Sequence, residues 1–153
     1  MRVMRVVRLV IHARSHQPVL LLIEVGGTRC LPVFLRQPQA QVIALGERGP
    51  SDPLLTQDLL VPVVHALGRR LERIELTNLR DGVFSAELVF DTDIRIQARP
   101  SDALCLAVRD GLPITVADAV LDEAGRPADE VLSSREQLRE FREFLDNVSP
   151  EDF

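Results

Sequence analysis

The hydrophobic residues in the first third of the chain follow patterns that are typical of strands more than of helices. Two apolar runs flank Gly26-Gly27, a pair that favours a two-residue hairpin turn. A short amphipathic stretch then ends at Gly46 and indicates a helix, before a polar loop that contains Gly and Pro. The predicted elements are strands over 3–11, 18–25 and 28–35, a helix over 38–45 and a loop over 46–53.

The apolar residues after this loop have helical spacing and predict a second helix. Thr56 can cap it, and Asp58 lies in its first turn, where the helix dipole favours negative charge. Pro62 lies inside the apolar stripe and predicts a kink or an early break, because proline donates no backbone hydrogen bond. Gly68 marks the end of this helix.

The middle of the chain predicts an antiparallel meander of strands over 72–79, 83–90 and 94–98. Asp81-Gly82 is a strong hairpin signal, and residues 91–93 provide the second turn. Turns of two and three residues would place side chains from the three strands in rows. The predicted rows are Asn78–Ser85–Arg99, Leu76–Glu87–Gln97 and Ile74–Val89–Arg95 on one face, with Leu79–Phe84, Ala86–Ala98 and Leu88–Ile96 on the core face.

A third helix is predicted over 102–110, directly after the meander. Ser101 can cap it, and Gly111 can end it. A short strand over 113–116 and a helical turn over 117–123 follow.

The C-terminal part reads as a linker followed by a last helix. Residues 125–133 have linker composition, and Ser133 with Glu136 fits a capping box. The apolar stripe of the last helix comprises Leu138, Phe141, Leu145 and Val148. It can pack on its own domain or on another subunit. The expected fold is α+β, an antiparallel-rich mixed β-sheet with helices packed on it, plus this C-terminal amphipathic helix.

Composition narrows the range of partners. Hydrophobic residues make up 46% of the chain but aromatic residues only 4%, without Trp or Tyr, so aromatic stacking of nucleotide bases is not expected. The net charge of −5 argues against nonspecific coating of nucleic acid. Residues 1–80 carry 11 Arg and 6 acids (+5), and residues 81–153 carry 7 Arg and 17 acids (−10). The basic part can present a local positive patch, or the charges can intermingle in the fold.

The two cysteines, Cys30 and Cys105, match no metal-ligand spacing and are expected to be buried. No secretory signal is visible, and no apolar stretch approaches the ~20 residues of a membrane span. A soluble, cytoplasmic protein that does not enter a membrane is the expectation.

The segment Arg-Pro-Ser-Asp at 99–102 is the strongest candidate for chemistry. Backbone N–H groups at a helix start, those of Asp102, Ala103 and Leu104, could bind an anion together with Arg99 and Ser101. Asp102 would repel a phosphate unless a divalent cation lay between them, as in metal-dependent phosphodiester chemistry. The alternative is purely structural, since a strand followed by a proline, a helix cap and an apolar helix is a common succession of elements in folded domains.

Several segments of the chain resemble the bifunctional nuclease domain family, from about residue 3 to residue 125. They are Leu31-Pro32-Val33, the sequence PLLTQDLL at 53–60, DGVFSA at 81–86 and, above all, ARPSDALCLAVRDGLPITV at 98–116. The resemblance implies a soluble α+β domain over 1–125 that self-associates, with residues 126–153 as linker and C-terminal helix. For some members it implies hydrolysis of DNA and RNA. It offers Arg99, Ser101, Asp102 and Asp81 as candidate site residues.

The chain departs from the family pattern at four polar positions. Gln39 stands where the family typically has Glu, Gln57 where it has His, Ser85 where it often has Tyr, and Gln97 where Asp is common. Carboxylates, imidazoles and phenols bind metals or move protons, so these departures bear directly on catalysis.

Two functions are therefore expected from different classes. The first is a nuclease assisted by a divalent cation, Mg²⁺ or Mn²⁺, held by Asp102 with Asp81 or Asp58. Arg99, Ser101 and Ala103 would bind the phosphate, and the partners would be nucleic acid and further copies of the chain. The second is a non-catalytic binding or assembly module in which the same segment is structural.

Overall fold

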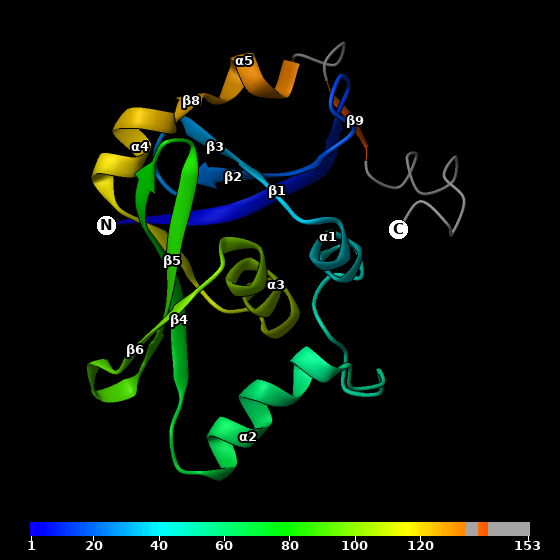
Figure 1. Ribbon diagram of the computed structural model, residues 1–153, viewed down its shortest axis with the longest axis vertical. Helices are drawn as coiled ribbons and strands as arrows, with labels where there is room; N and C mark the ends of the chain where they lie inside the picture. The colour runs from blue at the N-terminus through cyan, green and yellow to red at the C-terminus, as the bar shows by residue number, and fades with distance from the viewer. Residues whose placement is uncertain (134–137, 141–153) are drawn as a thin grey trace.

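The computed structural model describes residues 1–133 and 138–140 (Figure 1). Its strands are β1 (Arg2–His12), β2 (Pro18–Glu24), β3 (Arg29–Phe34), β4 (Leu71–Arg80), β5 (Val83–Phe90), β6 (Arg95–Ala98), β7 (Ile114–Val116), β8 (Arg126–Pro127) and β9 (Leu138–Glu140). Its helices are α1 (Gln37–Ile43), α2 (Leu60–Ala66), α3 (Pro100–Asp110), α4 (Asp118–Ala124) and α5 (Ala128–Ser133), with 3₁₀ turns η1 (Thr56–Leu59) and η2 (Asp91–Asp93).

The strands form one mixed sheet in the order β6-β5-β4-β7-β1-β2-β3-β8, and β9 pairs with β1. Only β4 and β7 run parallel among these pairs. Helix α3 lies between the two halves of the sheet with α1 beside it, and α2 lies at the opposite end from α4 and α5 (Figure 1). The architecture confirms the expected α+β class with an antiparallel-rich sheet.

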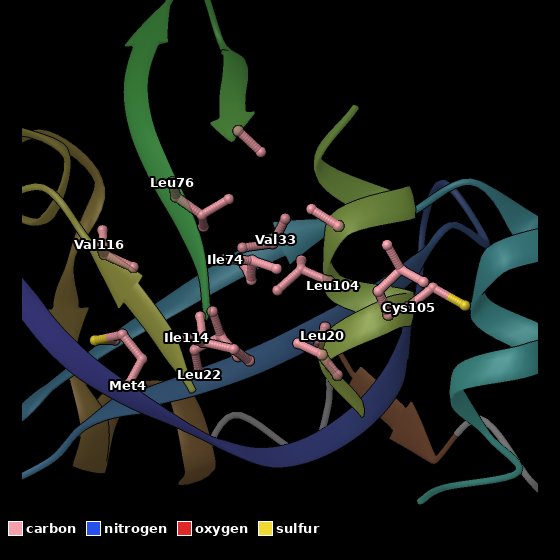
Figure 2. Packing of buried hydrophobic residues seen from close by; sticks show 14 of the residues in the cluster. Met4, Leu20, Leu22, Val33, Ile74, Leu76, Leu104, Cys105, Ile114 and Val116 are labelled. Carbon is pink, nitrogen blue, oxygen red and sulfur yellow. The ribbon is translucent and has the colours of Figure 1, made fainter. Parts of the chain in front are cut away.

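The main core lies where the strands face α3. Leu104 points toward Ile74 and Val33, and Met4, Leu22, Ile114 and Val116 close the far side (Figure 2). A smaller cluster on the other face of β1, β2 and β3 joins Val10, Val19, Leu21 and Cys30 to α5. Cys30 and Cys105 are both buried free thiols, as their apolar surroundings predict.

Strand positions follow the sequence prediction closely, but the connection between β2 and β3 differs. The β2–β3 connection has four residues, Val25 to Thr28, because β2 ends at Glu24 and β3 begins at Arg29. Gly26 adopts a φ of 74°, the left-handed region that favours glycine, so the turn prediction identified the right residues but too short a loop.

The meander has the predicted strands, and most of its register is confirmed. Asn78 pairs with Ser85, Glu87 with Gln97 and Val89 with Arg95. The predicted alignments of Leu76 with Glu87 and of Ile74 with Val89 are wrong. A β-bulge between Leu76 and Asn78 shifts β4 by one residue, so that Leu76 pairs with Ala86 and Ile74 with Leu88 on the core face.

The second helix begins differently from the prediction. Thr56 is the first residue of the 3₁₀ turn η1, and Leu55 occupies the N-cap position, where Asp58 accepts its N–H. Helix α2 then starts at Leu60. Pro62 lies in the first turn of α2, where a backbone donor is not needed, so it is accommodated without breaking the helix.

Helix α3 begins two residues earlier than predicted. Arg99 is its N-cap residue and Pro100 its first residue, a favoured position for proline. Ser101 is therefore not the cap. Its buried hydroxyl accepts the backbone N–H of Arg36, the N-cap residue of α1, at 3.1 Å. This bond fixes the start of α1 against the start of α3.

The segment with linker composition is attached to the domain. β8 pairs with β3 through Cys30 and Arg126, and Ala128 and Val131 of α5 pack on the smaller core cluster. The prediction of helix at Leu138 is wrong, because residues 138–140 form β9 on a part of β1 that β7 leaves unpaired. The rest of the predicted last helix, with Phe141, Leu145 and Val148, lies outside the described residues.

A buried ion pair ties the loop after α1 to helix α3. Arg109 donates from Nε to Asp58 Oδ1 at 3.1 Å and from Nη2 to Asp58 Oδ2 at 2.8 Å. The two side chains are 3% and 0% exposed. Arg109 also donates to the carbonyl of Gly46 and Leu55 donates to Asp58, so both charged groups are well satisfied.

Within the described part of the chain, no helix is long and apolar enough to cross a membrane.

The substitution Asp58→Asn should destabilise the protein by about 3–5 kcal/mol, because it leaves the Arg109 guanidinium buried without a charged partner. Urea denaturation of the wild type and the variant measures the difference in the free energy of unfolding. Asp129→Asn, which changes an exposed acid on α5, is the matched control and should cost less than about 0.5 kcal/mol. Equal stability of the two variants would contradict this role of Asp58.

The same pair gives the stability a defined pH dependence. Hydrogen bonding by Arg109 holds the pKa of Asp58 below its usual value of 3.8, and burial opposes the shift only in part. Because the unfolded state then binds the proton more tightly, this stabilisation is complete above about pH 5 and is lost as the pH falls through the folded pKa. The difference between wild type and Asp58→Asn should therefore narrow as denaturation is repeated at increasingly acidic pH.

The substitution Ser101→Ala should cost about 1 kcal/mol, because it removes the acceptor of the Arg36 N–H at the α1–α3 contact. Thermal or urea denaturation measures the loss. Ser51→Ala in the exposed loop is the control and should be nearly neutral. A Ser101→Ala variant as stable as this control would show that the bond contributes nothing.

Candidate functional site

A pocket of about 390 Å³ opens where α1, η1, the start of α2 and one face of α3 meet. Its lining is apolar along the walls and polar at a few points. The lining residues are Pro38, Gln39, Val42, Gln57, Leu60, Asp102, Cys105 and Leu106. Ligands usually bind in mostly apolar pockets that contain a few convergent polar groups.

The pocket exists because of the spacing of residues on α3. Asp102, Cys105, Leu106 and Arg109 are three, four and seven residues apart, so they lie on one helical face. Arg109 draws Asp58 against this face, and the neighbours of Asp58 on η1 and α2, Gln57 and Leu60, then line the pocket opposite α3.

Three polar side chains form a hydrogen-bonded chain at the pocket. Arg99 donates from Nε to Asp102 Oδ2 at 2.6 Å, and Gln39 donates from Nε2 to Asp102 Oδ1 at 2.9 Å. The side chains of Arg99 and Asp102 are 58% and 39% exposed, so this pair is accessible to solvent and is not an internal ion pair. No described residue forms a hydrogen bond or ion pair with the Nη groups of Arg99, which are available to an anion.

The thiol of Cys105 is a poor nucleophile. Burial raises its pKa to about 11, and a hydrogen bond with Gln57 lowers it only in part. The thiolate is the reactive form, so Cys105 contributes wall surface to the pocket and not nucleophilic chemistry.

The predicted phosphate site is brought together only in part. Arg99 and Asp102 lie at the pocket, but Ser101 does not line it, and its hydroxyl accepts the Arg36 N–H at the start of α1. Ala103 is buried, and its N–H donates to the carbonyl of Arg99 because the helix starts at Pro100. The unpaired N–H groups of the first turn are therefore those of Ser101 and Asp102, and not those of Ala103 and Leu104 as predicted.

The other two candidate acids lie in different surroundings. Asp58 has both oxygens bound by Arg109 and one of them also by the Leu55 N–H. Asp81 occupies the β4–β5 turn with a φ of 52°. Asp81 precedes Ala86 by five residues, and Ala86 pairs with Ala98 at the end of β6. Five residues span about 16 Å at the rise of a strand, so Asp81 lies about that far along the sheet from the end of β6.

The described side chains do not form a metal site by themselves. Among residues 1–133 and 138–140, no group of three or more His, Cys, Asp and Glu side chains could hold a metal ion. Asp102 is the carboxylate at the pocket, and its two oxygens already accept hydrogen bonds from Arg99 and Gln39. A cation with protein ligands alone does not fit this arrangement.

The four positions where the chain is expected to depart from the family pattern divide into two pairs. Gln39 and Gln57 both line the pocket. Ser85 and Gln97 do not line the pocket. Ala86 and Leu88 of β5 point into the core, so Ser85 and Glu87, which alternate with them, lie on the opposite face of the sheet. Gln97 pairs with Glu87 and lies on that opposite face as well. The predicted neighbour of Ser85, Arg99, lies beyond the end of β6.

Sequence reasoning missed Arg36 and the pocket walls. Arg36 is exposed, and its backbone is fixed beside Ser101, so a second guanidinium starts from the same corner as Arg99. A sequence signal could have revealed this corner. Helices α1 and α3 each have a proline within their first two residues that an arginine shortly precedes, in Arg-Gln-Pro at 36–38 and in Arg-Pro at 99–100.

Comparison with known proteins gives matches over most of the chain. The family model described as the bifunctional nuclease domain matches residues 20–129. Two proteins of Mycobacterium tuberculosis, the uncharacterized proteins MT1877 of strain CDC 1551 / Oshkosh and Rv1829 of strain ATCC 25618 / H37Rv, are each 41% identical over 157 residues. Each match covers 97% of this chain and 96% of the relative.

The match to the family model includes every residue that lines the pocket, together with Arg99. It also includes the buried ion pair of Asp58 and Arg109. The chain belongs to the bifunctional nuclease domain family.

Proposed function

We propose that this protein hydrolyses phosphodiester bonds of nucleic acid at the mouth of the pocket beside Arg99 and Asp102. The observation that carries the proposal is that this solvent-accessible pair adjoins a pocket of about 390 Å³ in a member of the bifunctional nuclease domain family. A cation and a carboxylate side by side at a cavity provide one group for a phosphate and one for a proton.

Arg99 would bind the phosphate. Its Nε is occupied by Asp102, while its two Nη groups can donate to two phosphate oxygens at once. Arg36, which starts from the same corner, would add positive charge for the flanking backbone. The guanidinium of Arg99 would also stabilise the negative charge that develops on the phosphate oxygens during the reaction.

Asp102 would act as the general base. A water molecule would attack phosphorus as its proton passes to Asp102, and the ester P–O bond would break. The leaving oxygen would take up a proton from solvent water, and Asp102 would then release its proton to solvent. Gln39 would position the carboxylate through its 2.9 Å hydrogen bond. The divalent cation suggested by the family resemblance would need the substrate's own phosphate as a ligand beside Asp102, so it is treated as an experimental variable.

The second candidate function is binding of nucleic acid without hydrolysis. It is favoured by Gln39 and Gln57, which line the pocket where the family pattern has a carboxylate and an imidazole. Carboxamides form hydrogen bonds but do not accept or release protons near neutral pH. Such a pocket can hold a ligand while lacking part of the machinery for proton transfer.

Cleavage assays with labelled single-stranded RNA and DNA should separate these functions. The wild type should cleave, and Asp102→Asn should be slower by roughly 10²-fold or more, since general-base catalysis typically contributes 10²–10⁴-fold. Arg99→Gln should weaken substrate binding and slow cleavage. Parallel reactions with Mg²⁺, with Mn²⁺ and with a chelator determine whether a cation takes part.

Glu123→Gln and Arg126→Gln, which change exposed residues away from the pocket, are the matched controls and should cleave like the wild type. Cleavage by Asp102→Asn at the wild-type rate would remove Asp102 from the mechanism. A wild type that binds the oligonucleotides but leaves them intact under every metal condition would establish the second candidate function.

A further inference from the structure

We propose that the pocket receives one unpaired nucleobase, while the phosphate stays outside at Arg99. This inference rests on the proposed function, in both of its forms, and adds which part of the nucleotide is recognised. It follows from the chemistry of the pocket walls, which differs from that of the mouth.

The walls favour a flat, weakly polar group. Pro38 and Val42 from α1, Leu60 from α2 and Leu106 from α3 supply aliphatic surface on three sides. A phosphate placed among them would lose its hydration without gaining donors, which is costly for a charged group. A base offers two apolar faces and carries its polar atoms on its edge.

The size of the cavity agrees with this assignment. Its volume of about 390 Å³ falls within the range of about 300–1,000 Å³ typical of small-molecule sites. Binding through such walls replaces the aromatic stacking that the chain cannot provide there, since no aromatic residue lines the pocket.

The polar groups of the pocket can serve the edge of a base. Gln57 presents a carboxamide, and glutamine can pair with adenine through one donor and one acceptor. The Oε1 atom of Gln39 is buried and accepts no hydrogen bond from the described residues, although its Nε2 donates to Asp102. An amino group on the edge of a base is the kind of donor that would satisfy this oxygen while Nε2 stays bound to Asp102.

This arrangement requires a base that is free of its complementary strand. A base stacked and paired inside a duplex cannot enter a pocket unless it is first extruded, which costs stacking and pairing energy. The pocket therefore selects single strands, loops or unpaired positions, and the phosphate beside the captured base is the one delivered to Arg99.

The direct test compares binding of AMP and ribose 5-phosphate to the wild-type protein by titration calorimetry or NMR. Both ligands carry the same phosphate, but only AMP carries a base, so AMP should bind on the order of tenfold or more tightly. Equal affinity for the two ligands would overturn the base pocket. This measurement needs no cleavage, so it is decisive even if the protein proves not to be a nuclease.

A pocket-filling variant locates the site. Val42→Phe should lower the affinity for AMP toward that for ribose 5-phosphate, because the larger side chain occupies the space of the base. Val63→Phe is the matched control, since Val63 is 53% exposed on α2 and does not line the pocket. Loss of AMP affinity in both variants, or in neither, would place the base elsewhere. If Val42→Phe fails to fold, the comparison of ligands in the wild type still decides the proposal.

An abasic oligonucleotide separates this inference from the proposed function. If the wild type cleaves single strands, replacing one nucleotide by an abasic residue should suppress cleavage at that position and leave it unchanged at distant positions. Cleavage at the abasic position with undiminished rate would leave the nuclease activity standing and refute the base pocket.

Discussion

The pairing of Asp58 with Arg109 is the interaction on which the rest of the site depends. Two opposite charges that water cannot reach are held by a bidentate contact, and each has further hydrogen bonds to the backbone. Such a pair contributes little net stability compared with apolar groups of the same size, but removing one partner is very costly. Its effect is to fix a long irregular segment, residues 44 to 55, and the η1 turn against one face of α3.

That constraint explains why a cavity is present at all. Helix α3 uses one side for the main core, where Leu104 meets strands from both halves of the sheet (Figure 2). Asp102, Cys105 and Leu106 line the pocket, although Cys105 and Leu106 also belong to the core. Without the segment that Asp58 holds in place, the pocket would lack the wall formed by Gln57 and Leu60. The hydrogen bond from Arg36 to Ser101 fixes α1 in the same way from the opposite direction. The result is a pocket whose walls come from three separate parts of the chain.

The charges around the pocket have distinct tasks. Arg109 is fully engaged in the fold, whereas Arg99 is exposed and keeps part of its guanidinium available. The same separation applies to the acids, since Asp58 is structural and Asp102 is accessible. A third set, in which Arg73 and Arg95 bind the buried Glu75, stabilises β4 on the sheet face away from α3. Burial and partner count, more than residue type, distinguish groups that hold the fold from groups that can meet a ligand.

The sequence by itself determined the main strands and helices up to α4, the fold class and the corner at Arg99 and Asp102. Periodicity, turn residues and proline positions act locally, so the strands of the meander and helix α3 could be placed within one or two residues. The tertiary structure decided what depends on distant partners: the bulge beside Thr77 that moved Leu76 onto the core face, the use of Ser101 by α1 and the burial of Asp58 by Arg109, 51 residues away. Local patterns carry no information about such contacts, because each is selected by packing between segments that are remote in the chain.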